Sequence, residues 1–321
     1  MIHIKNFLKY TKYFGIVTGL GVNLAHFFLN RTRNVSACYW LYEFKHKSIE
    51  RYLWNKYKTH LTRYTENSEK EVLDHSKMPI WVCWLQGEDH MPPMVGKCYK
   101  SIIEHAGSHP VVLITLENLY KYINLAPHIL SKYKQGIIGH PLFSDIIRIN
   151  LLCDYGGIWI DSTYLITGII PDNLLKNVFF SIKLKNSDNY SASRYRWQIS
   201  FISTNVVGSE LFKNLKCFFE EYTKNENQLI DYLLINYAID LQLQKISFLA
   251  DHFNAIPFTN PDLHTLRPLL SSQYDETFLN EMNENTWAYK LTYKESLMPN
   301  KKLLEKTSSG IETFYGRFIN E

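Results

Sequence analysis

The distribution of hydrophobic and polar positions divides the chain into three parts. Residues 1–76 have a mainly helical pattern and are rich in Tyr, Lys and Arg. Within them, residues 64–77 (YTENSEKEVLDHSK) are polar, which predicts either a connection or a solvated helix. A different pattern begins after Met-Pro at residues 78–79, with the continuous apolar run IWVCWL at residues 80–85. Such a run, rich in β-forming residues, is typical of a parallel strand buried on both faces.

From this point strands and helices alternate. We predict strands at residues 80–85, 110–115, 158–160, 178–184 and 198–203. We predict helices at residues 92–105, 117–133 (broken near Pro127), 145–155 (with Ser144 as N-cap and Gly156-Gly157 as its end), 209–222 and 228–244, before a closing segment at 288–293. This alternation implies βαβ units and a mostly parallel sheet flanked by helices, an α/β fold. The predicted organisation is a helical N-terminal extension, residues 1–76, followed by an α/β domain, residues 77–321.

The N-terminus contains an apolar run at residues 13–29, with lysines before it and arginines after it (Lys5, Lys9, Lys12, Arg31 and Arg33). The run is shorter than the roughly 20 residues of a spanning helix, and no clean signal-peptide cleavage site follows it. Two interpretations remain. One is a packed helix with a polar face, and the other is a helix that lies on an anionic membrane surface. The second predicts that residues 1–35 contact the inner face of the membrane in an otherwise cytoplasmic protein.

Composition narrows the class of protein. Apolar residues make up 45% of the chain, too many for a disordered protein. The net charge of +4 comes without a basic stripe, so a nucleic-acid partner is not expected. The five cysteines form no Cys-x-x-Cys pair, which indicates neither a disulfide framework nor a zinc site and favours a reducing setting. The sequence also lacks a Walker loop, a dinucleotide-binding fingerprint and a Gly-x-Ser-x-Gly turn.

The candidate chemistry lies where predicted strands end, because ligands of open α/β sheets bind beyond the carboxyl ends of the strands. Gln86 and Gly87 follow the first strand, and Asp161 follows the third. Asp145 and Arg148 are three residues apart in the preceding helix, and therefore share one face. They also lie in its first two predicted turns, where the helix dipole favours anions. Two carboxylates and a guanidinium suit a ligand that carries hydroxyl groups and a diphosphate.

These residues resemble a known family. The blocks FSDIIR at residues 143–148 and YGGIWID at residues 155–161 are similar to the sugar-binding region of DXD-motif glycosyltransferases. The similarity is closest to the capsular polysaccharide synthesis branch and covers about residues 78–295. Weaker similar blocks follow in the same order: IWVCWLQGE at residues 80–88, DYLL at residues 231–234 and KLTY at residues 290–293.

The resemblance implies a GT-A-like fold and the transfer of a hexose from a nucleotide-sugar donor, usually a UDP-sugar, with retention of configuration. The acceptor would be a hydroxyl of a glycan or lipid-linked oligosaccharide in surface polysaccharide synthesis. Asp145 and Arg148 would contact the donor sugar and diphosphate, and Asp161 would meet the ribose, the sugar or a divalent cation (Mn²⁺ or Mg²⁺). These three would be the catalytic residues. The other donor-binding residues would be Gln86, Gly87, Gly156, Gly157, Ser162, Thr163 and Lys290.

The motif departs from the family pattern at its second acid. Where Asp-x-Asp is usual, this chain has Asp161-Ser162-Thr163. A neutral hydroxyl binds Mg²⁺ or Mn²⁺ far more weakly than a carboxylate does. The capsular branch often has the Asp-Ser-Thr form, so the change questions metal dependence rather than activity. It also leaves a second hypothesis, a non-catalytic nucleotide-sugar or glycan-binding protein of the same fold.

Trp197 and Asp231 are the candidate acceptor-binding residues. Aromatic faces stack on sugars, but core packing explains Trp197 equally well. Asp231 belongs to a resembling block, and its predicted position in an amphipathic helix also fits a solvated face. Asp145 and Arg148 have a simpler explanation too, as an ion pair on a helix surface, and Asp161 could only cap its strand.

Overall fold

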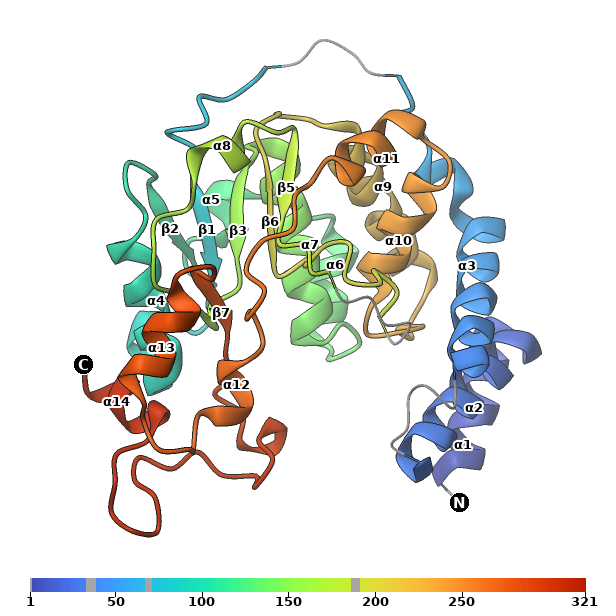
Figure 1. Cartoon of the computed structure of the whole chain (residues 1–321). Helices are drawn as coiled ribbons and strands as arrows, with labels where there is room; N and C mark the ends of the chain where they lie inside the picture. Colours follow the sequence, from blue (N-terminus) through green and yellow to red (C-terminus); the bar gives the residue numbers. More distant parts are fainter. Residues whose placement is uncertain (1, 33–38, 67–70, 186–190) are drawn as a thin grey trace.

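The computed structural model describes residues 2–32, 39–66, 71–185 and 191–321. The chain begins with three helices, α1 (Ile2–Phe14), α2 (Ile16–Thr32) and α3 (Tyr39–Leu61), which lie together on one side of the molecule (Figure 1). The helical prediction for this region is confirmed. The apolar run at residues 13–29 is nevertheless split, because Gly15 has a φ of 83° and separates α1 from α2.

The polar segment that follows α3 is a connection. Its described residues, 64–66 and 71–77, contain no helix. Val72 forms an isolated antiparallel bridge with Val206, and the backbone N–H of Leu73 donates to the carbonyl of Asn205 over 2.7 Å. The connection is therefore fastened to the central sheet before the first strand begins.

A five-stranded sheet in the order β2-β1-β3-β6-β5 forms the centre of the molecule (Figure 1). Its strands are β1 (Ile80–Cys83), β2 (Val111–Ile114), β3 (Gly157–Ile160), β5 (Phe179–Ser181) and β6 (Phe201–Thr204). β2, β1 and β3 pair in parallel, whereas β6 is antiparallel to both β3 and β5. Four strands thus share one direction and β6 opposes them, which confirms the predicted α/β fold with a mostly parallel sheet.

A smaller sheet and a second apolar cluster lie towards the C-terminus. β4 (Tyr164–Ile166) pairs with β7 (Ala288–Lys290) in antiparallel register. Around this pair lie α12 (Leu266–Leu269), α13 (Glu276–Asn283), the 3₁₀ turn Glu295–Leu297 and α14 (Phe314–Asn320). Their buried side chains form a cluster separate from the main core. This second cluster holds β7 beside the end of the central sheet.

The remaining helices pack around the central sheet. They are α4 (Pro93–Glu104), α5 (Leu119–Tyr122), α6 (Pro127–Lys134), α7 (His140–Asp154), α8 (Asp172–Leu175), α9 (Glu210–Asn225), α10 (Leu234–Leu243) and α11 (Ser247–Asn254), with a 3₁₀ turn at Glu88–His90. α7 packs on β1 and β3, and α9 lies between α7 and α3. The predicted break near Pro127 is confirmed, because α5 ends five residues before α6 begins at that proline.

One helix boundary differs from the prediction in a way that matters for the site. α7 begins at His140, with Gly139 at the N-cap and Pro141 in the first turn, rather than after Ser144. Proline fits a first turn because its missing N–H has no helical partner there. Asp145 and Arg148 therefore lie in the second and third turns. The prediction that both lie within the first two turns holds for Asp145 and is wrong for Arg148.

The main hydrophobic core is continuous from α1 to α11. It joins side chains of α2 and α3, such as Val22 and Ile49, to those of the sheet strands and of α7 and α9. A core of this extent links the helical segment firmly to the sheet. The domain boundary between residues 76 and 77 stays a prediction.

Candidate functional site

Four charged side chains meet at the carboxyl end of β3. Arg148 donates from one guanidinium nitrogen to Asp145 Oδ1 over 2.8 Å and from the other to Asp161 Oδ1 over 3.0 Å. Lys290 Nζ lies 2.7 Å from Asp161 Oδ2. Asp161 is thus the centre of a network of two carboxylates and two cations. We call these four residues the strand-end cluster.

Local chain geometry explains why residues so distant in sequence meet. β3 ends at Ile160, and the backbone N–H of Asp161 then donates to the carbonyl of Ser200 over 2.9 Å. In the small sheet, Tyr164 pairs with Lys290, and the N–H of Leu291 donates to the carbonyl of Thr163 over 2.9 Å. The pairing of β4 with β7 therefore places Lys290 beside the carboxylate of Asp161.

Two aromatic rings support the cluster. The Arg148 guanidinium lies 4.8 Å from the ring centre of Trp159, whose Nε1 also donates to Asp161 Oδ1 over 2.8 Å. Lys290 Nζ lies 4.8 Å from the ring centre of Tyr164. The prediction from sequence missed Trp159 and Tyr164. Strand period would have found Trp159, because residues two apart in a strand share a face.

Burial separates the cluster into inner and outer members. The Arg148 side chain is only 5% exposed, whereas those of Lys290 and Asp161 are 19% and 29% exposed. Both donor nitrogens of Arg148 that face the cluster are already bound to carboxylates. Arg148 is therefore placed to orient Asp145 and Asp161, and Asp161 and Lys290 are the members that a ligand can reach.

The two carboxyls have opposite pKa shifts. Burial would raise the pKa of Asp161, but Lys290, Arg148 and the hydrogen bond from Trp159 outweigh it, so the pKa is lowered. For Asp145, burial dominates over the attraction of Arg148 and raises the pKa to about 6. Asp161 is thus a carboxylate at neutral pH. Asp145, in contrast, takes up a proton at a pH only slightly below neutral.

Cys83 and Tyr232 lie close enough to the cluster to interact with it electrostatically. Burial raises the pKa of Cys83 to about 12, with opposing influences of Arg148 and Asp161. Tyr232 is 70% exposed, yet partial desolvation of its hydroxyl group and the charges of Asp145 and Asp161 raise its pKa. Tyr232 belongs to the DYLL block at residues 231–234. The resemblance therefore indicated the right segment, but the residue near the cluster is Tyr232 and not the predicted Asp231.

His264 lies on the Lys290 side of the cluster. The backbone N–H of Lys290 donates to the carbonyl of the preceding Leu263 over 2.8 Å. Burial, together with Arg267 and Lys290, lowers the pKa of His264 to about 4. Its imidazole is therefore neutral at physiological pH.

Gln86 and Gly87 lie at the same edge of the sheet as Asp161. β1 and β3 are parallel neighbours, so the turn after β1 and the residue after β3 emerge side by side. Gly87 has a φ of 90°, and its N–H donates to the carbonyl of Trp84 over 3.0 Å. The Trp84 ring in turn packs edge-on against Tyr293, 5.5 Å away between ring centres. The turn after β1 therefore borders the segment that carries Lys290.

Gly156 and Gly157 are not brought to the cluster. They lie at the amino end of β3, with φ values of 64° and 100°. A Cβ on Gly157 would lie 2.5 Å from the carbonyl oxygen of Pro79, and one on Gly156 would lie 2.8 Å from a methyl of Leu73. The structure gives these glycines a role in strand packing, at the end of β3 opposite to Asp161.

The two predicted acceptor residues are buried and already paired. Trp197 is 1% exposed, and its Nε1 donates to Asn236 Oδ1 over 2.8 Å. Its ring is therefore packed in the core and borders only a small cavity, so the structure favours the packing alternative. Asp231 precedes α10 rather than lying within it, and forms a buried ion pair with Lys45 over 2.7 Å. It is not on a solvated helix face.

The residues around Asp161 do not fit a resident divalent cation. Its Oδ1 accepts hydrogen bonds from Arg148 and Trp159, and its Oδ2 accepts one from Lys290. Ser162 is buried, and Thr163 offers only a hydroxyl. Across the described ranges, no group of three or more His, Cys, Asp and Glu side chains could hold a metal ion. Mg²⁺ and Mn²⁺ prefer several oxygen ligands, and the two cations here already balance the carboxylates.

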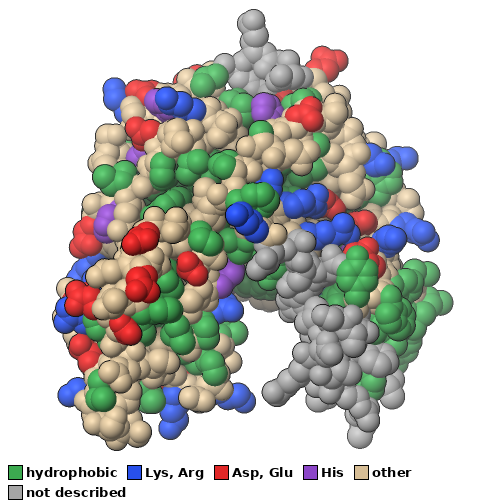
Figure 2. All heavy atoms as spheres, viewed as in Figure 1, with side chains coloured by type: hydrophobic (Ala, Val, Ile, Leu, Met, Phe, Trp, Pro, Cys, Tyr) green, Lys and Arg blue, Asp and Glu red, His purple; other side chains and the backbone are tan. Residues whose placement is uncertain are grey.

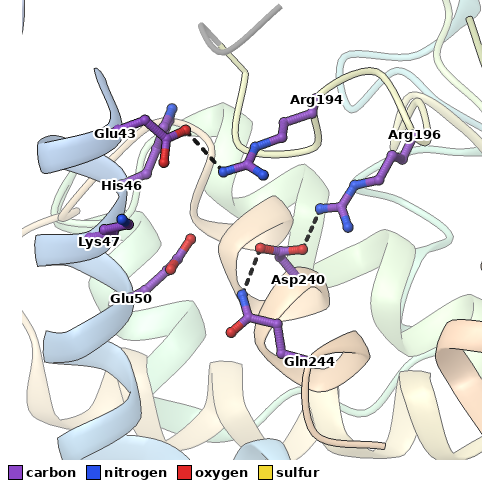
Figure 3. A pocket seen from close by; sticks show the side chains of 8 residues that line it. All are labelled: Glu43, His46, Lys47, Glu50, Arg194, Arg196, Asp240 and Gln244. Carbon is purple, nitrogen blue, oxygen red and sulfur yellow. Dashed lines mark hydrogen bonds and ion pairs between the residues drawn. The ribbon is translucent and has the colours of Figure 1, made fainter. Parts of the chain in front are cut away.

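A second set of charges lines a cavity of about 320 Å³ between α3, α10 and the segment before β6 (Figure 3). Arg194 pairs with Glu43 over 3.0 Å, and Arg196 pairs with Asp240. Glu50 points into the space between these pairs. We call this the α3–α10 cavity; its lining residues are Glu43, His46, Lys47, Glu50, Arg194, Arg196, Asp240 and Gln244. Arg196 and Gln244 also line a smaller adjoining cavity with Trp197.

Comparison with known proteins identifies one related family. The family model described as capsular polysaccharide synthesis protein matches residues 34–313, which include every member of the strand-end cluster and of the α3–α10 cavity. Comparisons with curated proteins and with solved structures gave no significant match.

Proposed function

The chain belongs to the capsular polysaccharide synthesis protein family, and from this premise we propose that it is a glycosyltransferase. The proposed reaction moves a hexose from a nucleotide sugar, a UDP-hexose, to a hydroxyl of a glycan or lipid-linked oligosaccharide, with retention of configuration. The observation that supports it is the strand-end cluster, where Asp161 and Lys290 remain partly exposed on a buried base of Arg148 and Trp159.

The geometry suggests separate roles for Lys290 and Asp161 in this reaction. Lys290 is the accessible cation, and it would stabilise the negative charge that grows on the leaving diphosphate. Asp161, ionised and held by Arg148, would accept hydrogen bonds from hydroxyls of the donor. The bond from the anomeric carbon to the diphosphate breaks, the bond to the acceptor oxygen forms, and the acceptor hydroxyl releases its proton to the leaving group.

Cationic side chains of the protein, rather than a metal ion, would provide most of the stabilisation of the negative charge on the diphosphate. A divalent cation remains the expectation from the family resemblance, and if bound it would neutralise diphosphate charge near Asp161. Because both oxygens of Asp161 are already engaged by Arg148, Trp159 and Lys290, we assign no step to a metal. Turnover should therefore persist when divalent metal is removed.

For the acceptor, the α3–α10 cavity is a better candidate than the buried Trp197 ring. Carboxylates, guanidinium groups and an amide suit the hydroxyls of a glycan. Glu50 faces the cavity between two ion pairs, and burial together with Asp240 raises its pKa. If acceptor sugars bind here, Glu50→Gln raises the KM for the acceptor severalfold and leaves the slow hydrolysis of the donor unchanged.

The central experiment is a donor assay on the full chain. Radiolabelled UDP-hexoses are incubated with the protein in EDTA and, separately, in Mn²⁺, and both transfer and slow donor hydrolysis are measured. We expect turnover in both conditions. Lys290→Gln should lower it by about 10²-fold, the usual effect of losing one transition-state contact. Lys294→Gln, an exposed lysine four residues further along, is the matched control and should leave turnover unchanged.

Calorimetry distinguishes the second hypothesis. Donor binding that is lost in Lys290→Gln but never accompanied by turnover, across a panel of glycan acceptors, would show a nucleotide-sugar-binding protein instead of an enzyme. Absence of both binding and turnover for all UDP-hexoses would refute the proposed donor class. Turnover in Mn²⁺ alone would refute the assignment of the charge-stabilising role to Lys290.

A further inference from the structure

Over its first ten residues, helix α2 packs with mostly small side chains inward and large ones outward. The buried positions of its first ten residues are Thr18, Gly19, Gly21, Val22 and Ala25. The exposed ones include Ile16 (63% exposed), Val17, Leu20 and Leu24. At 100° per residue these four lie within one third of the helix circumference. The interpretation of this run as a packed helix is confirmed by the contacts of α2 with α1 and α3, but the predicted polar face is wrong for residues 16–25, whose outward side is aliphatic.

Tight contacts on the inward face fix this orientation. A Cβ on Gly19 would lie 2.6 Å from Thr11 Oγ1 in α1, and a Cβ on Gly21 would lie 2.7 Å from Ser48 Oγ in α3. The two glycines let α2 lie closely against both neighbours. Turning the helix to bury Leu20 would place a large side chain where the structure has room only for glycine. The exposure of the aliphatic face is thus a consequence of how the three helices pack.

The apolar surface extends onto the neighbouring helices. Leu8 and Tyr13 are exposed on α1, and Tyr39, Trp40 and Phe44 are exposed at the start of α3. Figure 2 shows hydrophobic side chains gathered over these helices, at the lower right of the molecule. We call the exposed residues the N-terminal apolar face; they are Leu8, Tyr13, Ile16, Val17, Leu20, Leu24, Tyr39, Trp40 and Phe44. Contiguous apolar surface of this kind marks an interaction site.

The charges around this face indicate its partner. Residues 1–42 contain five Lys and Arg residues and no Asp or Glu, and the first acid is Glu43. Since the whole chain has a net charge of only +4, the rest of it is close to neutral. Lys9 and Lys12 are exposed on α1, next to Leu8 and Tyr13. A second copy of the chain would bring like charges together, whereas an anionic lipid surface offers the opposite charge.

We propose that the N-terminal apolar face lies in the headgroup region of an anionic lipid bilayer. The aliphatic residues of α2 enter the boundary between headgroups and acyl chains, Trp40 and Tyr39 occupy the interface, and the lysines of α1 contact lipid phosphates. In the described part of the chain, no helix is long and apolar enough to cross a membrane. The protein is thus held on the bilayer surface.

This attachment would orient the rest of the molecule. The N-terminal helices and the C-terminal segments extend in the same direction, and the space-filling view is hollowed between them (Figures 1 and 2). β1 points towards this hollow, so the edge that carries Asp161 does as well. A bilayer at the N-terminal helices would place the hollow close to lipid-linked molecules. The attachment itself does not depend on the proposed reaction.

The test is sedimentation of the full chain with vesicles of phosphatidylcholine alone and of phosphatidylcholine with phosphatidylglycerol at 3:1. We expect binding to the anionic vesicles that weakens with salt. Leu20→Glu should lower the partition by at least about tenfold, because it places a charge in the apolar boundary. Lys9→Gln combined with Lys12→Gln should lower it by about tenfold or more on anionic vesicles only.

The control is Ile169→Glu, which changes an aliphatic residue outside this face that is even more exposed (69%) than Leu20 (39%), and it should bind as wild type does. Circular dichroism and donor hydrolysis in solution should be unchanged in Leu20→Glu, which separates membrane attachment from folding and from the reaction. Equal binding to neutral vesicles, or no binding to either kind, would overturn the proposal. Concentration-dependent dimers abolished by Leu20→Glu, with no vesicle binding, would instead identify a second copy as the partner.

Discussion

β3 is only four residues long, yet its two ends are held in different ways. At the amino end, Gly156 and Gly157 adopt positive φ angles and lie against backbone and side-chain atoms that leave no room for a Cβ. At the carboxyl end, Asp161 is held by Arg148, Trp159 and Lys290 through ionic and hydrogen bonds. One end depends on steric fit and the other on charge, although both belong to the single block YGGIWID.

This difference separates residues that maintain the fold from residues that meet a ligand. Gly157 lets the carbonyl of Pro79 accept a hydrogen bond from Ile158 over 2.8 Å, which brings β3 against the start of β1. Asp161 adds nothing to that pairing, yet it is the group that faces the solvent. The block YGGIWID therefore contains residues that maintain the fold and a residue that can meet a ligand. Substitution of its glycines should change stability, and substitution of Asp161 should change turnover.

The largest expected effect is at the charged end. Asp161→Asn keeps the shape of the side chain and removes the charge that holds Arg148 and Lys290. We expect turnover of a UDP-hexose to fall about 10³-fold, near 4 kcal/mol, with the circular dichroism spectrum retained. Steady-state hydrolysis of labelled donor measures the effect. Turnover within tenfold of wild type would remove Asp161 from the proposed mechanism.

At the glycine end we expect a loss of stability. Gly157→Ala should lower the free energy of unfolding by about 3 kcal/mol, since it combines an unfavourable φ of 100° with a contact of 2.5 Å to the Pro79 carbonyl. Gly156→Ala should cost about 1–2 kcal/mol, because the nearest atom is the flexible methyl of Leu73. Urea denaturation compares the two. Equal losses would contradict the steric explanation, as would a folded Gly157→Ala protein with impaired donor affinity.

The smallest effect concerns the pH dependence of stability at Asp145. Its pKa is about 6 in the folded protein, against 3.8 as the ordinary value, so the folded state holds the proton more tightly. The stability that this group contributes is present at low pH and is lost as pH rises from about 4 through 6. Relative to wild type, Asp145→Asn should gain about 2 kcal/mol between pH 4.5 and pH 7.5. Parallel urea titrations at the two pH values would reveal the gain; a difference that does not vary with pH would show that Asp145 is not buried as described.

Local sequence signals predicted the succession of elements well but not their boundaries. The apolar runs at residues 80–85 and 110–115 became β1 and β2, and Pro127 begins α6. The start of α7 was missed because Ser144 is a good N-cap by type, while Gly139 and Pro141 form the actual beginning. The boundary error also affected the electrostatic argument, which had placed both Asp145 and Arg148 within the first two turns, whereas Arg148 lies in the third.

The candidate site shows the same limit. Asp145, Arg148 and Asp161 could be grouped from their spacing and from the strand that precedes Asp161. The orientation of Trp197 could not, because whether an aromatic residue is buried or faces a ligand depends on segments distant in sequence, here Asn236. Tyr164 and Trp159 were not predicted as site residues because aromatic residues in strands usually pack in the core. In this structure their ring faces also lie against the cations Lys290 and Arg148.

The sequence by itself determined the α/β class, the order of strands and helices, and the position of one carboxylate at a strand end, because these depend on local pattern. Only the tertiary structure decided that Lys290 completes the network around Asp161, since these two residues are 129 positions apart and meet through the pairing of β4 with β7. It also decided that α2 faces outward with its large side chains. This orientation depends on the close fit of Gly19 and Gly21 against α1 and α3. The pattern of hydrophobic residues along the chain cannot predict such a fit.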